Sequence, residues 1–152
     1  MTVGDFEGDN NYPLYASLSR REIRSLIFHL LYAVEGFDYT ASLEAIIDMF
    51  NRGYDWDILP DSDAAKMAQA IIDAREELDE LIRPLLANWR LERIGVCTKL
   101  ILRMSVWELK NSDTAPSIVM NEAIELAKCF SEKDAYRFIN GVLDELCKVD
   151  EK

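Results

Sequence analysis

The strongest constraint on the fold is the spacing of apolar residues, which recur at i, i+3 and i+4 in segment after segment from Ser19 onward. The first segment carries Ile23, Leu26, Leu30 and Val34, and this spacing lines one face of an α-helix. No segment shows the sustained two-residue alternation of a half-buried strand. The chain has 152 residues, the length of one domain. The sequence therefore predicts an all-α fold, a bundle of six to seven helices joined by short connections.

Start and stop signals divide the chain. Residues 1–17 are polar and acidic, and we expect a flexible N-terminal arm followed by a single helical domain over 18–152. Gly36 is a stop signal, Thr40 a candidate cap for the second helix, and Pro116 suits the first position of a helix. The expected helices are 19–36, 40–53, a long helix 61–81 that ends near Pro84, a short one 85–90, 96–110, 116–130 and 135–146.

Composition excludes several classes of protein. The 28 acidic side chains outnumber the 17 basic ones, for a net charge of −11, which argues against indiscriminate binding of nucleic acid. No apolar run reaches the roughly 20 residues of a membrane span, and the acidic start lacks the features of a secretory signal, so we expect a cytoplasmic protein. Three scattered cysteines and one histidine predict no metal site. We expect reduced, mostly buried thiols.

Three arginines nevertheless gather at one expected helix start, at Arg20, Arg21 and Arg24. At 100° per residue, Arg21, Arg24, Phe28 and Tyr32 fall on one stripe. Guanidinium groups grip phosphates and aromatic rings stack on unpaired bases, so this combination suits single-stranded RNA. Arginine near a helix N-terminus also opposes the helix dipole, so local stability does not explain it. The competing interpretation is a solvated face with Phe28 in the core.

The sequence contains no motif that indicates catalysis. GxGxxG, GxxxxGK[ST], HExxH and GxSxG are all missing. His29, the single histidine, has no cysteine partner at a supporting spacing. We therefore expect no enzyme, no catalytic residue and no cofactor.

The C-terminal part resembles a known family. NEAIELAKCF (residues 121–130) followed by RFINGVLDEL (137–146) is similar to the signature of the NusB family of bacterial transcription antitermination factors. LERIGVCTKLILRMSVWEL (91–109) resembles the preceding family helix, and RREIRSLIFHLLYA (20–33) resembles the first one. The likeness spans about residues 19–147, and residues 38–90 match mainly in helical pattern.

The resemblance implies an all-α fold in two subbundles and a function. Family members bind boxA-type RNA together with NusE, a small-subunit ribosomal protein, within the RNA polymerase antitermination complex. The family's RNA-contacting helix start corresponds to Arg20, Arg21 and Arg24. Further RNA contacts of the family correspond to three residues around the start of the last helix, Asp134, Arg137 and Phe138. The family's NusE contact corresponds to Tyr32 on the first helix.

Other residues have structural interpretations or depart from the family pattern. We expect Asn121 and Asn140 to satisfy buried backbone groups and Gly141 to allow close helix packing. We also expect Arg103 to form a structural ion pair with Glu108 or Glu122. Glu22 replaces a basic residue that many relatives carry.

Two alternatives to RNA binding remain open. One is a protein-interaction module that binds NusE, or forms a homodimer, without significant RNA binding of its own. The sequence leaves open whether the chain is a monomer or a homodimer. A second is the related helical domain of ribosomal-RNA methyltransferases, which we do not expect because no Rossmann-like segment follows.

Overall fold

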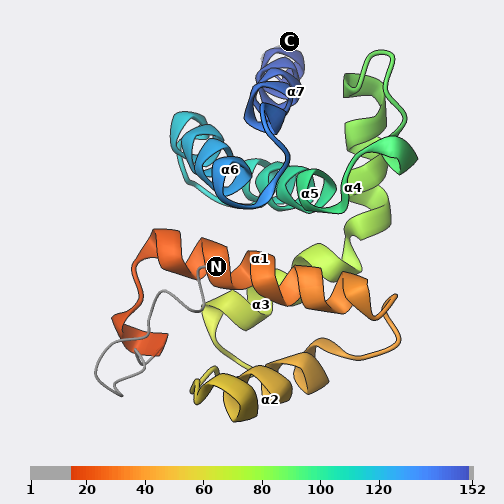
Figure 1. Ribbon diagram of the computed structural model, residues 1–152. Helices are drawn as coiled ribbons and strands as arrows, with labels where there is room; N and C mark the ends of the chain where they lie inside the picture. The colour runs from red at the N-terminus through yellow and green to blue at the C-terminus, as the bar shows by residue number, and fades with distance from the viewer. Residues whose placement is uncertain (1–14, 151–152) are drawn as a thin grey trace. The chain divides into compact units, whose positions relative to one another are not determined.

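The computed structural model describes residues 15–150, which contain seven α-helices, three short 3-10 helices and no strand (Figure 1). The chain divides into two compact units, Met1–Ile72 and Asp73–Lys152. The expected all-α fold with two subbundles is therefore confirmed. Residues 1–14, most of the expected N-terminal arm, lie outside the described range. Tyr15–Ser17 form a 3-10 helix, in which the backbone N–H of Tyr15 donates to Asp57 at 2.7 Å.

The first unit is built from α1 (Arg20–Gly36), α2 (Leu43–Tyr54) and α3 (Asp63–Asp73). Its core includes three residues of the apolar spacing predicted for the first helix. These are Leu26, Leu30 and Val34, and they are joined by residues of the next two helices, Ile46, Ile47, Ala68 and Ile71, all nearly inaccessible to solvent. Fully burying one such Leu or Ile side chain contributes about 1.5–3 kcal/mol. Packing of these faces, more than helix propensity, stabilises the helices of this unit.

The second unit packs α4 (Arg75–Ile82), α6 (Pro116–Phe130) and α7 (Ala135–Asp150) around α5 (Val96–Asn111). Every residue from Leu100 to Val106 on α5 is buried. Arg103 is among them, and its guanidinium makes two hydrogen bonds with the Asp79 carboxylate, at 2.8 and 2.7 Å. Asp79, which the sequence did not indicate, is thus a bidentate partner of Arg103, and the expected pairing with Glu108 or Glu122 stays a prediction.

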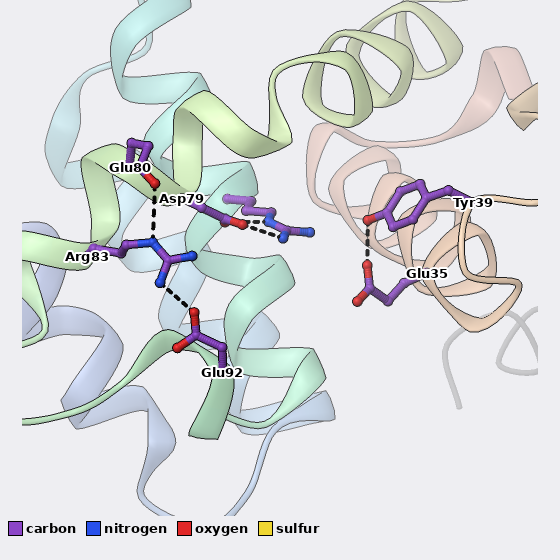
Figure 2. A network of polar contacts seen from close by, with 7 residues as sticks. Glu35, Tyr39, Asp79, Glu80, Arg83 and Glu92 are labelled. Carbon is purple, nitrogen blue, oxygen red and sulfur yellow. Dashed lines mark hydrogen bonds and ion pairs between the residues drawn. The ribbon is translucent and has the colours of Figure 1, made fainter.

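Several charged and polar contacts lie at the surface of each unit. Arg83 lies between Glu80 and Glu92, with nitrogen–oxygen distances of 3.3 and 2.5 Å (Figure 2). In the first unit, the Tyr39 hydroxyl donates to Glu35 near the end of α1 (Figure 2).

Several expected helix boundaries are wrong. Ser42, and not Thr40, caps α2, because its side chain accepts from the Ala45 backbone N–H. The expected helix 61–81 is two helices, because Ala74 leaves helical geometry at φ −94° and ψ 6°. In place of a helix at 85–90 the chain forms two 3-10 turns, Arg83–Leu85 and Leu91–Arg93. Pro116 does occupy the start of α6 as expected.

Three structural roles expected in the C-terminal motif are also wrong. Asn121 and Asn140 are exposed, so they do not satisfy buried backbone groups. Gly141 is exposed as well, and a Cβ added there would meet no atom within 4 Å, so it serves no close helix packing. Of the cysteines, Cys129 is exposed and the other two are half-buried.

Candidate nucleic-acid interface

The first part of the candidate interface is the start of α1. Arg20 and Arg21 are exposed, and Arg24 is half-buried. A capping box begins the helix: the Ser19 hydroxyl accepts from the Glu22 N–H at 3.1 Å, and the Glu22 carboxylate accepts from the Ser19 N–H at 3.0 Å. Ser19-x-x-Glu22 is the sequence signature of this motif, which sequence reasoning overlooked. Glu22 therefore stabilises the helix start that presents the arginines. The positive charge of the arginines by itself would destabilise a helix N-terminus, because it opposes the helix dipole.

The aromatic stripe expected beside the arginines is only half present. Phe28 is 3% exposed and belongs to the core, so the interpretation of its ring as a free stacking surface is wrong. The cause is that α1 is buried on every residue from Ser25 to Leu31, and not along one stripe. Tyr32 is 48% exposed, with its ring centroid 6.2 Å from that of Phe28. Tyr32 thus presents its ring to solvent while the ring rests against the buried Phe28.

His29 is a satisfied core residue. It is buried, and its Nδ1 lies 2.7 Å from the Ser25 carbonyl oxygen. Burial lowers the pKa of His29, because the charged imidazolium loses its hydration. The side chain is therefore placed to pack and not to exchange protons with a bound molecule.

The second part of the candidate interface is a pocket in the second unit, where α5 and α7 begin. Its volume is about 240 Å³. Asp134 and Phe138, both expected at RNA, line it. The remaining lining residues come from the segment before α5, the first turns of α5, and the turn before α7: Trp89, Arg93, Ile94, Gly95, Thr98, Glu132, Lys133 and Ala135.

Two aromatic rings form the apolar part of this pocket. Trp89 is 63% exposed, and its ring packs edge-to-face against Phe138, with centroids 6.3 Å apart at an angle of 73°. Phe138 is half-buried. The ring thus lies on the apolar side of α7 and still lines a pocket at the rim of the helix, and its contact with RNA stays a prediction.

A basic cluster surrounds Tyr136 next to the pocket. Arg137 Nε donates to the Tyr136 hydroxyl at 3.1 Å, and the guanidinium carbon lies 5.6 Å from the ring centroid. Lys128 Nζ lies 5.2 Å from the centroid of the same ring. The hydrogen bond with Tyr136 raises the pKa of Arg137. Arg137 thus stands, fully charged and exposed, one residue from a pocket-lining ring.

The structure therefore brings three of the expected residues, Asp134, Arg137 and Phe138, to one region of the second unit. Arg20, Arg21 and Arg24 form the other group, on α1 of the first unit. Sequence reasoning missed Trp89, although a tryptophan followed by two arginines, as in NWRLER (88–93), is a signal that could have found it.

Two further kinds of feature were sought among the described residues, a metal site and a membrane-spanning helix. Among residues 15–150, no group of three or more His, Cys, Asp or Glu side chains is arranged to hold a metal ion. Within the same range, no helix combines the length and the apolar character needed to cross a membrane.

Comparisons with known proteins agree on one family. The model described as "NusB family" matches residues 21–148. The transcription antitermination protein NusB of Staphylococcus carnosus (strain TM300) is 38% identical over 132 residues, which cover 85% of this chain and 99% of that protein. Its namesake from Macrococcus caseolyticus (strain JCSC5402) is 34% identical, covering 86% and 98%. The solved structure of T. maritima NusB is 30% identical, with a TM-score of 0.75, and covers 86% of this chain and 92% of that one.

Proposed function

The chain belongs to the NusB family, and from that premise we propose that it is a transcription antitermination factor that binds boxA-type single-stranded RNA together with NusE. It would act in the cytoplasm, within the RNA polymerase antitermination complex, without catalysis or a cofactor. The observation that carries the proposal is the exposure of Arg20 and Arg21 at a helix start that a capping box holds in place.

In this proposal the two groups of residues have different tasks. Arg20, Arg21 and Arg24 bind phosphates through forked hydrogen bonds, which fix the position of the RNA backbone. Phe138 stacks on an unpaired base, and Arg137 contacts the backbone next to it. Asp134 lies beside that ring in the pocket lining and accepts hydrogen bonds from the RNA.

The exposed ring of Tyr32 is proposed for the NusE contact. It lies on the same helix as the arginines, three turns after Arg21, and presents an amphipathic surface of the kind that protein interfaces favour. NusE then contributes the remaining surface, and RNA affinity rises when NusE is present.

Binding of a fluorescently labelled boxA-type RNA, measured by anisotropy with and without NusE at two salt concentrations, tests the proposal. Each neutralised phosphate contributes about 0.7 to the salt slope for a single strand, so replacing Arg20, Arg21 and Arg24 with Ala should lower the slope by about 2. The control is the double variant Arg52→Ala with Lys66→Ala, which removes two exposed basic side chains of the same unit. Equal binding by parent and triple variant would refute the mechanism.

The net charge of −11 favours one alternative, an interaction module that binds NusE, or pairs with a second copy, without useful RNA affinity. The same titration separates the two: NusE binding that RNA does not strengthen supports the module. Light scattering on these samples distinguishes a monomer from a homodimer.

A further inference from the structure

The pocket in the second unit contains more than the RNA contacts proposed above require. Trp89, Gly95, Thr98 and Glu132 line it together with Phe138. Trp89 leaves 63% of its surface in solvent, where a flat ring can stack on it. The groups around the pocket determine which ligand it can take.

The backbone at two places around the pocket is held in an unfavourable conformation. Ala87, two residues before Trp89, has φ 54°, and the pocket-lining Asp134 has φ 68°. A non-glycine residue in the left-handed region is uncommon, and such residues cluster at ligand sites, where the surrounding structure enforces them. The segments that carry the indole and the carboxylates are thus positioned at some conformational cost.

Glycine at position 95 leaves room for one carboxylate beside it. A Cβ built on Gly95 would be 2.9 Å from Glu132 Oε1, closer than two such atoms can approach. The missing side chain lets the Glu132 carboxylate occupy the pocket wall. Next to it the Thr98 and Ser131 hydroxyl groups lie 3.1 Å apart, with Thr98 itself buried in the wall. The pocket therefore combines flat aromatic surface with a carboxylate acceptor, that of Glu132, in its lining.

The size and charge of the pocket select the class of ligand. Its volume of about 240 Å³ is below the roughly 300–1,000 Å³ of pockets that enclose drug-sized molecules, so it suits one flat ring system. Arg93 and Lys133 in its wall suit a phosphate attached to that ring. A carboxylate accepts hydrogen bonds from exocyclic amino groups of bases, and it faces the carbonyl oxygen that uracil has instead.

We propose that this pocket takes one unpaired RNA base with an exocyclic amino group, stacked on Trp89 and hydrogen-bonded to Glu132. The inference rests on the proposed RNA binding and extends it. Phe138 and Trp89 form the aromatic surface together, and Arg93 and Lys133 contact the phosphate of the same nucleotide. At the nucleotide that occupies the pocket, cytosine, adenine or guanine is preferred over uracil.

The experiment uses the full chain with NusE, the boxA-type RNA, and a series of RNAs in which each base in turn is replaced by uracil. For the parent, replacement at one position should weaken binding more than at the others. Trp89→Ala should weaken binding of the original RNA about 5- to 150-fold, the scale of one base–aromatic stack, without changing the salt slope. Tyr54→Ala, which removes an exposed ring of the first unit, is the control and should bind as the parent does.

Two conservative variants test the role of the carboxylate without removing aromatic surface. Glu132→Gln keeps the shape but adds a donor, so discrimination against uracil at the sensitive position should shrink toward one. Gly95→Ala should have the same effect, because the new Cβ displaces the Glu132 carboxylate. Far-UV circular dichroism verifies that each variant is folded.

The outcomes separate the two proposals. If the parent binds RNA through its arginines but Trp89→Ala and Glu132→Gln leave affinity and base preference unchanged, the pocket inference is overturned and the proposed function stands. If the parent does not bind RNA even with NusE, both fail.

Discussion

Replacing Asp79 with Ala removes the bidentate partner of a buried guanidinium and should destabilise the second unit strongly. The side chains of Arg103 and Asp79 are 7% and 15% exposed, and their two hydrogen bonds measure 2.8 and 2.7 Å. Breaking a buried ion pair by removing one partner costs about 3–5 kcal/mol, and the partial exposure of Asp79 places our expectation near 3 kcal/mol. For a chain of this size that corresponds to a fall in Tm of about 6–12 °C.

Urea unfolding followed by tryptophan fluorescence and circular dichroism measures this loss. Glu92→Ala is the matched control, because it removes a carboxylate 2.5 Å from Arg83 in a pair whose side chains are 44% and 63% exposed. Solvent screens such a pair, so its removal should have little effect. A loss for Asp79→Ala no larger than that for Glu92→Ala would refute the reasoning.

Three further predictions concern single side chains. Gly141→Ala should raise the free energy of unfolding by about 0.5–1 kcal/mol in a urea titration, because the position is helical and a Cβ there meets no atom within 4 Å. Ser19→Ala should lower it by about 1 kcal/mol through loss of the capping box, and Glu22→Gln, which can still accept from the Ser19 N–H, should lower it less. Burial lowers the pKa of His29 below its ordinary value of 6.5, so the unfolded chain takes up a proton at a higher pH than the folded chain does. The contribution of the neutral His29 to the free energy of unfolding is therefore complete above about pH 6.5 and is lost as the pH falls below it. His29→Gln should therefore give a flatter stability profile between about pH 7 and pH 5 in thermal melts at matched ionic strength.

Apolar periodicity predicted the helices well wherever local sequence determines them. The recurrence of Ile23, Leu26 and Leu30 located α1, and Pro116 marked the first position of α6. These features act within one or two helical turns, so they can be read without knowledge of the rest of the fold.

Features that depend on distant segments could not be predicted in this way. Nothing in the local sequence around Ala74 breaks a helix, yet the chain leaves helical geometry there because the two halves of the expected helix pack in different units. Phe28 was assigned to an exposed stripe by its angle on a helical wheel, but the middle of α1 is covered on all sides. A wheel gives the direction of a side chain and not what lies in that direction.

The pocket illustrates the same limit for the candidate site. Asp134 and Phe138 were expected at RNA only through the family resemblance, and Trp89 was not expected at all. Trp89 and Phe138 are 49 positions apart in the sequence, and their rings meet only because α7 packs beside the segment that precedes α5. No spacing within a single helix could show this contact.

The two groups of residues proposed to bind RNA should differ in how salt changes their contribution to RNA affinity. This difference also determines how strongly the acidic net charge of the chain opposes binding. The arginines at the start of α1 act through phosphate charge, so their contribution falls as counterions compete. Stacking on Trp89 and Phe138 carries no net charge and should persist at high salt. At physiological ionic strength charges are screened beyond about 8 Å, so the net charge of −11 weakens long-range attraction more than it weakens direct contacts. Arginine variants should therefore change the slope of affinity against salt, whereas Trp89→Ala should shift the whole line in parallel. A parallel shift for the arginine variants, or a change of slope for Trp89→Ala, would show that the two contributions are not divided in this way.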